Sequence, residues 1–335
     1  MRKARNGRST ELVSRRVSPG AALLVAVIVA ALAAVLYVPA YAGGYEVEIV
    51  FSMLVYLTLA EAWNLLAGYG GLVSLGSSAF IGIGAYILAG LLNHGGVPVA
   101  AALIVSGLGA ALLAAVVSPA VFRLRGLYFT VGTLALGEAA RLFMINVPFF
   151  GGASGIFLDV TLPATGALYP YAVALLALAT LIVSLYTRTR FSVILRSVRD
   201  DEDAAAQLGV RVFRIKFAAF TIASFLMGAA GGLQAYKLGA IEPYGMFGLQ
   251  WAVNVLAIVI IGGLGQRAGA LVGTIFVVVL NELIASYPEI HIAITGVILI
   301  AVIRFAPKGL VGLAEDAFRR PQRNVHLGTP AAGAS

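Results

Sequence analysis

The sequence predicts an all-α fold, a polytopic transmembrane helical bundle of about ten spans. Three observations predict it. Of the 335 residues, 60% are hydrophobic and only 11% are charged, whereas soluble domains are about 25% charged. Apolar runs of bilayer-spanning length recur along the chain. Lys and Arg gather in segments between these runs, as expected of loops on one side of a membrane.

Composition also excludes several classes of protein. The chain has no Cys, which excludes a disulfide framework and thiol metal ligands. Its net charge of +8 comes from residues beside apolar runs rather than from one basic face. We therefore expect the lipid bilayer as a partner and no nucleic acid. The expected location is the cytoplasmic (inner) membrane, as a multi-pass protein.

The length rule of about 20 apolar residues per span predicts where the helices lie. The ten predicted spans are 21–41, 49–67, 72–92, 99–118, 127–147, 171–186, 217–237, 250–264, 268–287 and 290–305. The third of them is rich in Gly and Ser, so a broken or re-entrant helix is an alternative there.

The distribution of Lys and Arg predicts the orientation. Six basic residues against one acid within 1–20 keep the N-terminus in the cytoplasm. Ten spans then return the C-terminus to the cytoplasm, and every basic loop falls on the same side. Small residues at Ala40 and Ala42 leave an alternative, in which the first apolar run is a cleaved signal.

Three regions follow one another along the chain. They are a basic cytoplasmic N-terminus (1–20), a transmembrane domain (21–310) with a charged cytoplasmic loop (188–216), and a cytoplasmic tail (311–335) that we expect to be disordered. Two pairs of short motifs indicate an internal repeat: "GYGGLVSLG" with "IIGGLGQRAG", and "VFRLRGL" with "VIRFAPKGL". Their offset of six spans predicts parallel halves, an arrangement found in transporters.

The loop 188–216 is the densest charged segment, with 11 charged residues among 29. Its pattern predicts a helix over 193–208 that ends at Gly209. Helical spacing places four small or apolar side chains on one face: Ile194, Val198, Ala205 and Leu208.

Charge placement within this segment favours docking to a soluble protein. Arg196 with Asp200 and Arg199 with Asp203 stand four residues apart, so each pair is expected to add a few tenths of a kcal/mol to the helix. The alternative is a helix lying on lipid head groups. Four consecutive acids, Asp200 to Asp203, argue against it, because anionic lipid would repel them.

The stretch "EDAAAQLGV" (202–210) resembles the cytoplasmic-loop signature of ABC importer permeases, an E-A-A segment followed shortly by Gly. It departs from the best-known pattern, since Asp203 separates the Glu from the alanines and no Leu-Pro follows. The wider run "RDDEDAAAQLGVRVFRIKFAAFTIASFLMGAAGGLQA" resembles the permease of branched-chain amino-acid importers, of the M type, as do "GGLGQRAGALVGTIFVVVLNELI" and "RLRGLYFTVGTLALGEAARL". The resemblance covers residues 50–310, essentially the whole membrane domain.

This resemblance implies a larger machine. It implies that the cytoplasmic loop of this chain inserts a coupling helix into a cleft on an ATPase subunit. The residues that would make this contact are Asp200, Asp201, Glu202, Ala204, Ala205 and Gly209. Two ATPase subunits, a second homologous permease and an extracellular or periplasmic solute-binding protein complete the machine. ATP and Mg²⁺ are used by the ATPase partner. The present chain lacks G-x-x-x-x-G-K-[ST], so we expect it to bind no cofactor and no metal.

Polar residues within the predicted spans are candidates for the translocation path or for helix packing, because a charge at mid-bilayer costs about 2.5–3.5 kcal/mol on insertion scales. The candidates are Glu61, Asn64, Glu138, Arg141, Asn254, Asn281 and Glu282. Glu138 and Arg141 share a helix face, so they either form an ion pair that locks helices together or line the path. Interhelical hydrogen bonding is the expected role of the two span asparagines of the second half.

The expected function is that of a membrane permease subunit of an ATP-binding-cassette importer, which moves branched-chain (hydrophobic) amino acids into the cell by alternating access. Three His and no Cys are too few for a metal or catalytic cluster, so we do not expect an enzyme. An ion-coupled secondary transporter also fits buried charges and repeats, but it leaves the charged loop unexplained. Urea, amides or another small organic solute remain alternative cargoes.

Overall fold

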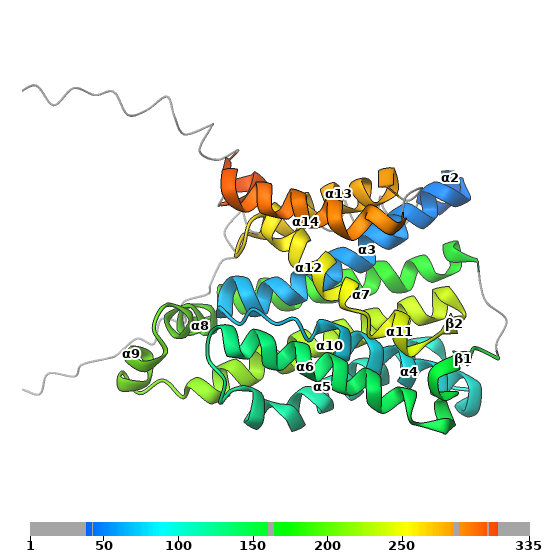
Figure 1. Cartoon of the computed structure of the whole chain (residues 1–335), viewed down its shortest axis with the longest axis horizontal. Coiled ribbons are helices and arrows are strands. Elements are labelled where there is room, and N and C mark those ends of the chain that lie inside the picture. The colour runs from blue at the N-terminus through cyan, green and yellow to red at the C-terminus, as the bar shows by residue number, and fades with distance from the viewer. Residues whose placement is uncertain (1–37, 42, 160–163, 285–287, 307, 314–335) are drawn as a thin grey trace, which may run out of the picture.

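The structure of the protein is a computed structural model that describes residues 38–41, 43–159, 164–284, 288–306 and 308–313. The N-terminal segment, nearly all of the predicted first span and most of the predicted tail lie outside the described residues. The described helices form a bundle whose members run along the long axis of the molecule (Figure 1).

Helices make up almost all of the described chain. The longer ones are α3 (Gly44–Asn64), α4 (Ser77–Gly95), α5 (Val99–Val121), α6 (Leu127–Ile145), α7 (Thr165–Arg188), α8 (Arg190–Asp200), α10 (Val212–Leu238), α12 (Leu249–Gly262), α13 (Arg267–Ile284) and α14 (Pro288–Phe305). The shorter elements are α2 (Val38–Tyr41), α9 (Glu202–Gln207), α11 (Pro243–Met246), the π-helical turn η1 (Leu65–Tyr69), the 3₁₀ turns η2 (Pro148–Phe150) and η3 (Gly152–Ser154), and the strands β1 (Ile156–Phe157) and β2 (Ala240–Ile241).

Eight helices of the described residues are long and apolar enough to cross a membrane. A ninth is counted when α6 is taken together with the turns that follow it at a bend of 86°. The predicted all-α, multi-pass architecture is therefore confirmed, whereas the total of ten spans stays a prediction. α4 is one continuous helix of 19 residues, and the non-helical part of the third predicted span is confined to the stretch 71–76 before it.

α10 lies in the middle of the bundle and packs against α4 and α5. Small residues bring the backbones together. A Cβ atom on Gly84 of α4 would lie 2.0 Å from the carbonyl oxygen of Gly228 in α10, and one on Gly231 would lie 2.1 Å from that of Ile81. Membrane helices associate through such close contact, because lipid supplies little hydrophobic drive between them. This interface has no room for a larger side chain at these positions.

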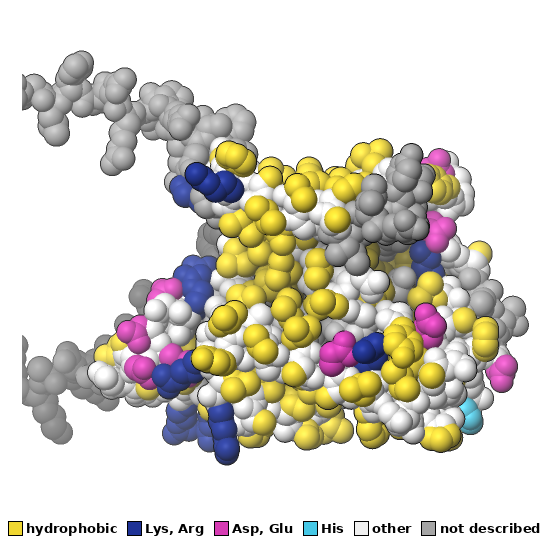
Figure 2. Space-filling view, viewed as in Figure 1, with side chains coloured by type: hydrophobic (Ala, Val, Ile, Leu, Met, Phe, Trp, Pro, Cys, Tyr) yellow, Lys and Arg dark blue, Asp and Glu magenta, His cyan; other side chains and the backbone are white. Residues whose placement is uncertain are grey.

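The two ends of the bundle differ in charge. Among the described residues, every Lys and Arg lies at the end of the bundle that carries α8 and α9, except Arg141 and Lys237 (Figures 1 and 2). The opposite end carries the antiparallel pair β1–β2, in which Ile156 faces Ile241. By the positive-inside rule, the basic end is the one expected to face the cytoplasm. The described basic loops thus lie together, as the sequence predicts.

The second pair of repeated motifs has one local feature in common. Gly126 and Gly309, which stand at matching positions, both have positive φ angles of 54° and 72°, a conformation that favours glycine. The parallel repeat of whole halves stays a prediction.

Candidate functional site

The charged loop between α7 and α10 folds as two helices, so the single predicted helix over 193–208 is wrong. Asp201 separates α8 from α9 in an extended conformation (φ −156°, ψ 109°). Its carboxylate accepts hydrogen bonds from the backbone N–H groups of Asp203 (3.0 Å) and Ala204 (2.9 Å). Aspartate is a favoured N-cap because it satisfies donors that the first helical turn leaves unpaired. The cap therefore begins a new helix at Glu202.

Gly209 follows the end of α9, as predicted. Its φ angle is +85°. Its N–H donates to the carbonyl oxygen of Ala206 (2.9 Å), and the N–H of Val210 donates to that of Ala205 (3.1 Å). These two bonds form a Schellman motif, the usual ending of a helix at glycine. α9 is thus a short helix with a defined cap at each end.

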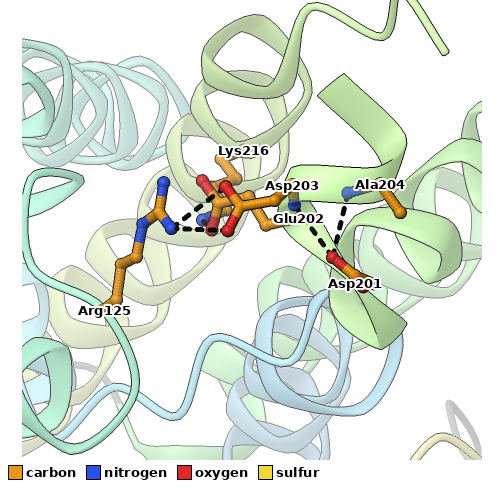
Figure 3. A network of polar contacts seen from close by, with 6 residues as sticks. All are labelled: Arg125, Asp201, Glu202, Asp203, Ala204 and Lys216. Atoms are coloured by element: carbon orange, nitrogen blue, oxygen red, sulfur yellow. Dashed lines mark hydrogen bonds and ion pairs between the residues drawn. The ribbon is translucent and has the colours of Figure 1, made fainter. Parts of the chain in front are cut away.

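Ion pairs tie α9 to other parts of the chain (Figure 3). Glu202 pairs at 2.5 Å with Lys216 near the start of α10, and the Lys216 side chain is only 7% exposed. Asp203 accepts two hydrogen bonds of 3.1 Å from Arg125 in the turn between α5 and α6. The predicted pairing of Asp203 with Arg199 is therefore wrong, because the cap at Asp201 turns Asp203 toward Arg125.

α8 reaches η1, the π-helical turn that directly follows α3, through Arg199. Its guanidinium donates to the carbonyl oxygen of Gly68 (3.0 Å) and pairs with Asp200 (2.8 Å). Arg196 lies 5.3 Å from the ring centroid of Tyr69, so its predicted pairing with Asp200 is also wrong. Gly68 and Tyr69 belong to η1, and such π-helical turns occur frequently at functional positions.

One surface of α9 is open to solvent. Ala204, Ala206, Gln207 and Leu208 are exposed, and Leu208 is 86% exposed. Ala205 faces inward and is 2% exposed. Leu208 therefore does not share one face with Val198 and Ala205, as predicted, because the break at Asp201 rotates α9 relative to α8.

The structure divides the predicted coupling residues into two groups. Asp200, Asp201, Glu202 and Ala205 hold the α8–α9 unit through an ion pair, a cap, a second ion pair and burial. Ala204 and Gly209 face solvent beside Leu208. Sequence reasoning missed the anchoring partners, which come from distant segments: Arg125, Lys216 and the Gly68 carbonyl.

Glu61 and Asn64 lie on α3 near the basic end, and both are buried. Asn64 accepts a hydrogen bond from the N–H of Gly265 (2.8 Å) and donates to the carbonyl oxygen of Gln266 (3.2 Å). These bonds join α3 to the turn between α12 and α13. Glu61 differs, since its Oε2 atom has no hydrogen-bond partner among the described residues.

The polar candidates of the second half contact other helices. Asn254 of α12 donates to the Tyr56 hydroxyl of α3 (3.4 Å), in agreement with the expected interhelical bond. Glu282 of α13 accepts a hydrogen bond from the Tyr45 hydroxyl of α3. Asn281 precedes it and is half-buried.

Glu138 and Arg141 form an ion pair within α6, with Nε and Nη2 each 2.7 Å from Oε2 of the carboxylate. The pair does not lock two helices together by itself, because both partners stand on one helix. Arg141 reaches a second element through the ring of Tyr244 in α11, at 4.8 Å from the ring centroid. Arg141 thus joins α6 to α11 through a cation–π contact, and both roles considered for the pair, helix packing and path lining, stay predictions.

No group of three or more His, Cys, Asp or Glu side chains within the described ranges is placed to hold a metal ion. The features that stand out at the basic end are instead the capped helix α9, its anchors and its exposed surface. Together these features form a candidate binding surface.

Residues 45–303 match the family model described as branched-chain amino acid transport system, permease component. The permease LivM of Salmonella typhimurium, from a high-affinity branched-chain amino acid transport system, is 29% identical over 84% of this chain and 72% of its own length. The autoinducer 2 import permease LsrC of Enterobacter sp. is 29% identical over 85% of this chain and 84% of its own length.

A third relative, the permease LivH of the Salmonella typhimurium branched-chain system, is 27% identical over 41% of this chain and 45% of its own length. No solved structure gives a significant match. The family model spans well over half of the chain, and the helices have the length and apolarity of membrane spans. The chain therefore belongs to the permease family of branched-chain amino acid transport systems, as a multi-pass protein of the cytoplasmic membrane.

Proposed function

We propose that this protein is the permease subunit of an ATP-driven importer that moves branched-chain (hydrophobic) amino acids into the cell. Membership of a permease family supports a transport subunit, and similarity to LivM over most of both chains supports the cargo. One observation carries the proposal: at the basic end, a short helix capped at both ends presents an exposed apolar residue, Leu208, among small side chains.

The proposed machine contains partners that supply what this chain lacks. Two ATPase subunits bind ATP and Mg²⁺ and receive α9 in a cleft. A second permease pairs with this one, and the partial similarity to LivH supports a related chain in that role. A solute-binding protein delivers the amino acid at the opposite end of the bundle.

The contacts of α8 and α9 provide two routes by which the ATPase can move the membrane helices. The first runs from Glu202 through Lys216 to the start of α10, which packs against α4 and α5 in the middle of the bundle. The second runs from Arg199 to Gly68 in η1, which directly follows α3. Asn64 extends this second route to the turn before α13. A movement of α9 would thus tilt helices in both halves and switch access from one side to the other.

The test is uptake by the complete transporter in liposomes, with ATP inside and the loaded binding protein outside. We expect ATP-dependent uptake of radiolabelled leucine, isoleucine and valine. Leu208→Glu should reduce uptake at least tenfold, because a carboxylate replaces the apolar contact, whereas the matched Leu208→Met should be near wild type. Uptake that persists without ATP, or that Leu208→Glu leaves unchanged, would overturn the proposal.

A second candidate cargo, autoinducer 2, is supported by the match to LsrC. This match covers 84% of the length of LsrC, whereas the match to LivM covers 72% of the length of LivM. The same assay therefore includes autoinducer 2. If this compound competes with leucine uptake or is itself transported in place of leucine, the mechanism stands and the cargo assignment changes.

A further inference from the structure

The ion pair of Glu138 and Arg141 lies in the second half of α6, a helix that qualifies as a membrane span only together with the turns that follow it. Arg141 is about 6 Å from the end of this helix at 1.5 Å per residue. At 1.5 Å per residue, Glu138 is about 16 Å from the start of α6 at Leu127 and about 10 Å from its end at Ile145. Among described residues, it is one of the few charged groups away from the ends of the bundle. Figure 2 shows acidic and basic side chains together on a surface that is otherwise mostly hydrophobic.

The pair is open to the surroundings rather than enclosed by packing. The Glu138 side chain is 53% exposed and the Arg141 side chain 24% exposed. Within the described residues, Glu138 bonds to Arg141 alone, and Tyr244 beneath the guanidinium is 54% exposed. A pair that served only to hold helices together would be covered by the helices that it holds.

Lipid is a poor environment for this surface. Charged side chains inside membrane domains almost always face the bundle interior or a water-filled cavity, because hydrocarbon solvates them badly. The neighbours of Glu138 on the exposed side of α6, such as Val131, Ala135 and Leu142, are apolar. A single polar spot within an apolar surface fits a path for a solute that is itself mostly apolar.

We infer that Glu138 and Arg141 receive the charged groups of an amino-acid zwitterion during passage, with Glu138 binding the α-ammonium and Arg141 the α-carboxylate. This inference rests on the proposed function. The ammonium and carboxylate of an amino acid stand on one carbon atom, and the i,i+3 spacing of the pair presents both complementary charges side by side. When the ligand binds, each side chain exchanges its ion pair with the other for an ion pair with the zwitterion, so the site is electrically neutral with and without the ligand.

The surroundings fit the rest of such a ligand. A guanidinium binds a carboxylate through two parallel hydrogen bonds, and Arg141 keeps its contact with the Tyr244 ring in doing so. Val131 and Leu142, both more than half exposed, offer apolar surface to an aliphatic side chain. The pair in its empty state neutralises itself, so the path needs no bound ion at rest.

The absence of Cys in the chain makes the inference directly testable by thiol labelling. Ala139 is exposed beside Glu138, so Ala139→Cys reports on this surface, and Ala110→Cys, at a fully buried position of α5, is the matched control. The complete transporter is treated with a membrane-impermeant methanethiosulfonate. We expect labelling of Ala139→Cys and none of Ala110→Cys, and we expect L-leucine to slow labelling several-fold. Leucinamide, which lacks the carboxylate, should not slow it.

Uptake kinetics separate recognition from a structural role. Glu138→Gln and Arg141→Gln should each lower kcat/KM for leucine by about tenfold or more, since each loses a charged hydrogen bond to the ligand. The double variant E138Q/R141Q leaves no unpaired charge. A merely structural pair would therefore be rescued in the double variant, whereas a recognition site stays impaired.

Three results would overturn the inference. They are an Ala139→Cys that resists labelling, as when lipid or the second permease covers it; labelling that leucine leaves unchanged; and normal uptake by the double variant. Uptake by the wild type shows whether only the zwitterion-binding inference fails or the proposed function fails as well. If the wild type imports leucine but these tests fail, only the inference falls. If the wild type imports no amino acid, the proposed function falls with it.

Discussion

The basic end of the molecule and the centre of its bundle are held together by different forces. At the basic end, α9 is attached by a cap and by ion pairs to Lys216 and Arg125. In the centre, α4 and α10 meet backbone to backbone at Gly84 and Gly228. The first kind of contact can be loosened one group at a time, whereas the second tolerates no added atom.

These two kinds of contact would let a permease move without losing its fold. Polar contacts between exposed groups contribute little each, because water competes for them. Closely packed helices tolerate no local change in their contact area, because any added atom would overlap with a backbone and force the whole helix to shift. Movement driven by the proposed ATPase partner should therefore begin at α9 and pass to intact helices as rigid bodies.

The largest effect is expected in the centre, from Gly84→Val. The added side chain would overlap the Gly228 carbonyl, since even a Cβ atom would lie 2.0 Å from it. Overpacking costs about 1–3 kcal/mol where neighbours can adjust and more where they are backbone. We expect loss of monodisperse protein in detergent by size-exclusion chromatography. Gly44→Ala, where a Cβ meets nothing within 4 Å, should be normal, and a normal Gly84→Val would refute the close contact.

The next effect belongs to the most enclosed ion pair of α9. Glu202→Gln would leave the Lys216 ammonium, only 7% exposed, without its counter-charge. Breaking a buried ion pair costs about 3–5 kcal/mol of folding free energy. Because Glu202 is partly exposed, the expected loss of stability is about 3 kcal/mol or less. A lowered Tm is expected, with recovery in the double variant E202Q/K216M. A Tm equal to that of the wild type would show that Lys216 is not held by Glu202.

Asp201 should have a smaller effect, restricted to α9. Asp201→Ala removes the N-cap, which is worth about 1 kcal/mol, so the helix should fray while the bundle stays intact. About 1 kcal/mol corresponds to roughly a fivefold loss of affinity for a partner that binds the folded helix. Binding of the ATPase subunit, measured by titration in detergent, checks this. Asp201→Asn keeps a good cap and should bind like the wild type, so equal losses in both variants would contradict the capping role.

The smallest effect is expected from the exposed pair at the same end. Arg125 and Asp203 have side chains 62% and 70% exposed, and such pairs contribute about 1 kcal/mol or less. Asp203→Asn should lower Tm slightly at low ionic strength and not at 1 M salt, where the Debye length is about 3 Å. A large decrease in Tm at both salt concentrations would instead show that this pair is as important for stability as the buried contacts.

Much of the fold follows from local patterns in the sequence. Apolar runs predict the positions of α5, α10 and α13 within a few residues, because span length is set by the bilayer. The loops that carry Arg123, Arg267 and Lys308 sort to one end for the reason that the positive-inside rule describes. Gly209 also ends its helix as predicted, since glycine adopts a positive φ angle at little cost.

The site was harder to predict because its contacts are long-range. Four-residue spacing predicted partners for Asp200 and Asp203, but Arg199 and Arg125 lie closer in the folded chain. The break at Asp201 did have a sequence signal: an Asp followed at once by acids, which favour the first turn of a helix. The exposure of Glu138 had no such signal, since spacing gives its helix face but not what covers that face.

Docking of an ATPase on α9 is tested most directly by retention of the ATPase subunit by the permease during purification in detergent. Wild type, Leu208→Met and Leu208→Glu are compared, each checked for a monodisperse elution profile. We expect wild type and Leu208→Met to retain the ATPase, and we expect Leu208→Glu to lose it and remain folded. Equal retention by all three would contradict the claim that the exposed surface of α9 docks the ATPase, and absence of the ATPase from all three would contradict an ATP-driven machine.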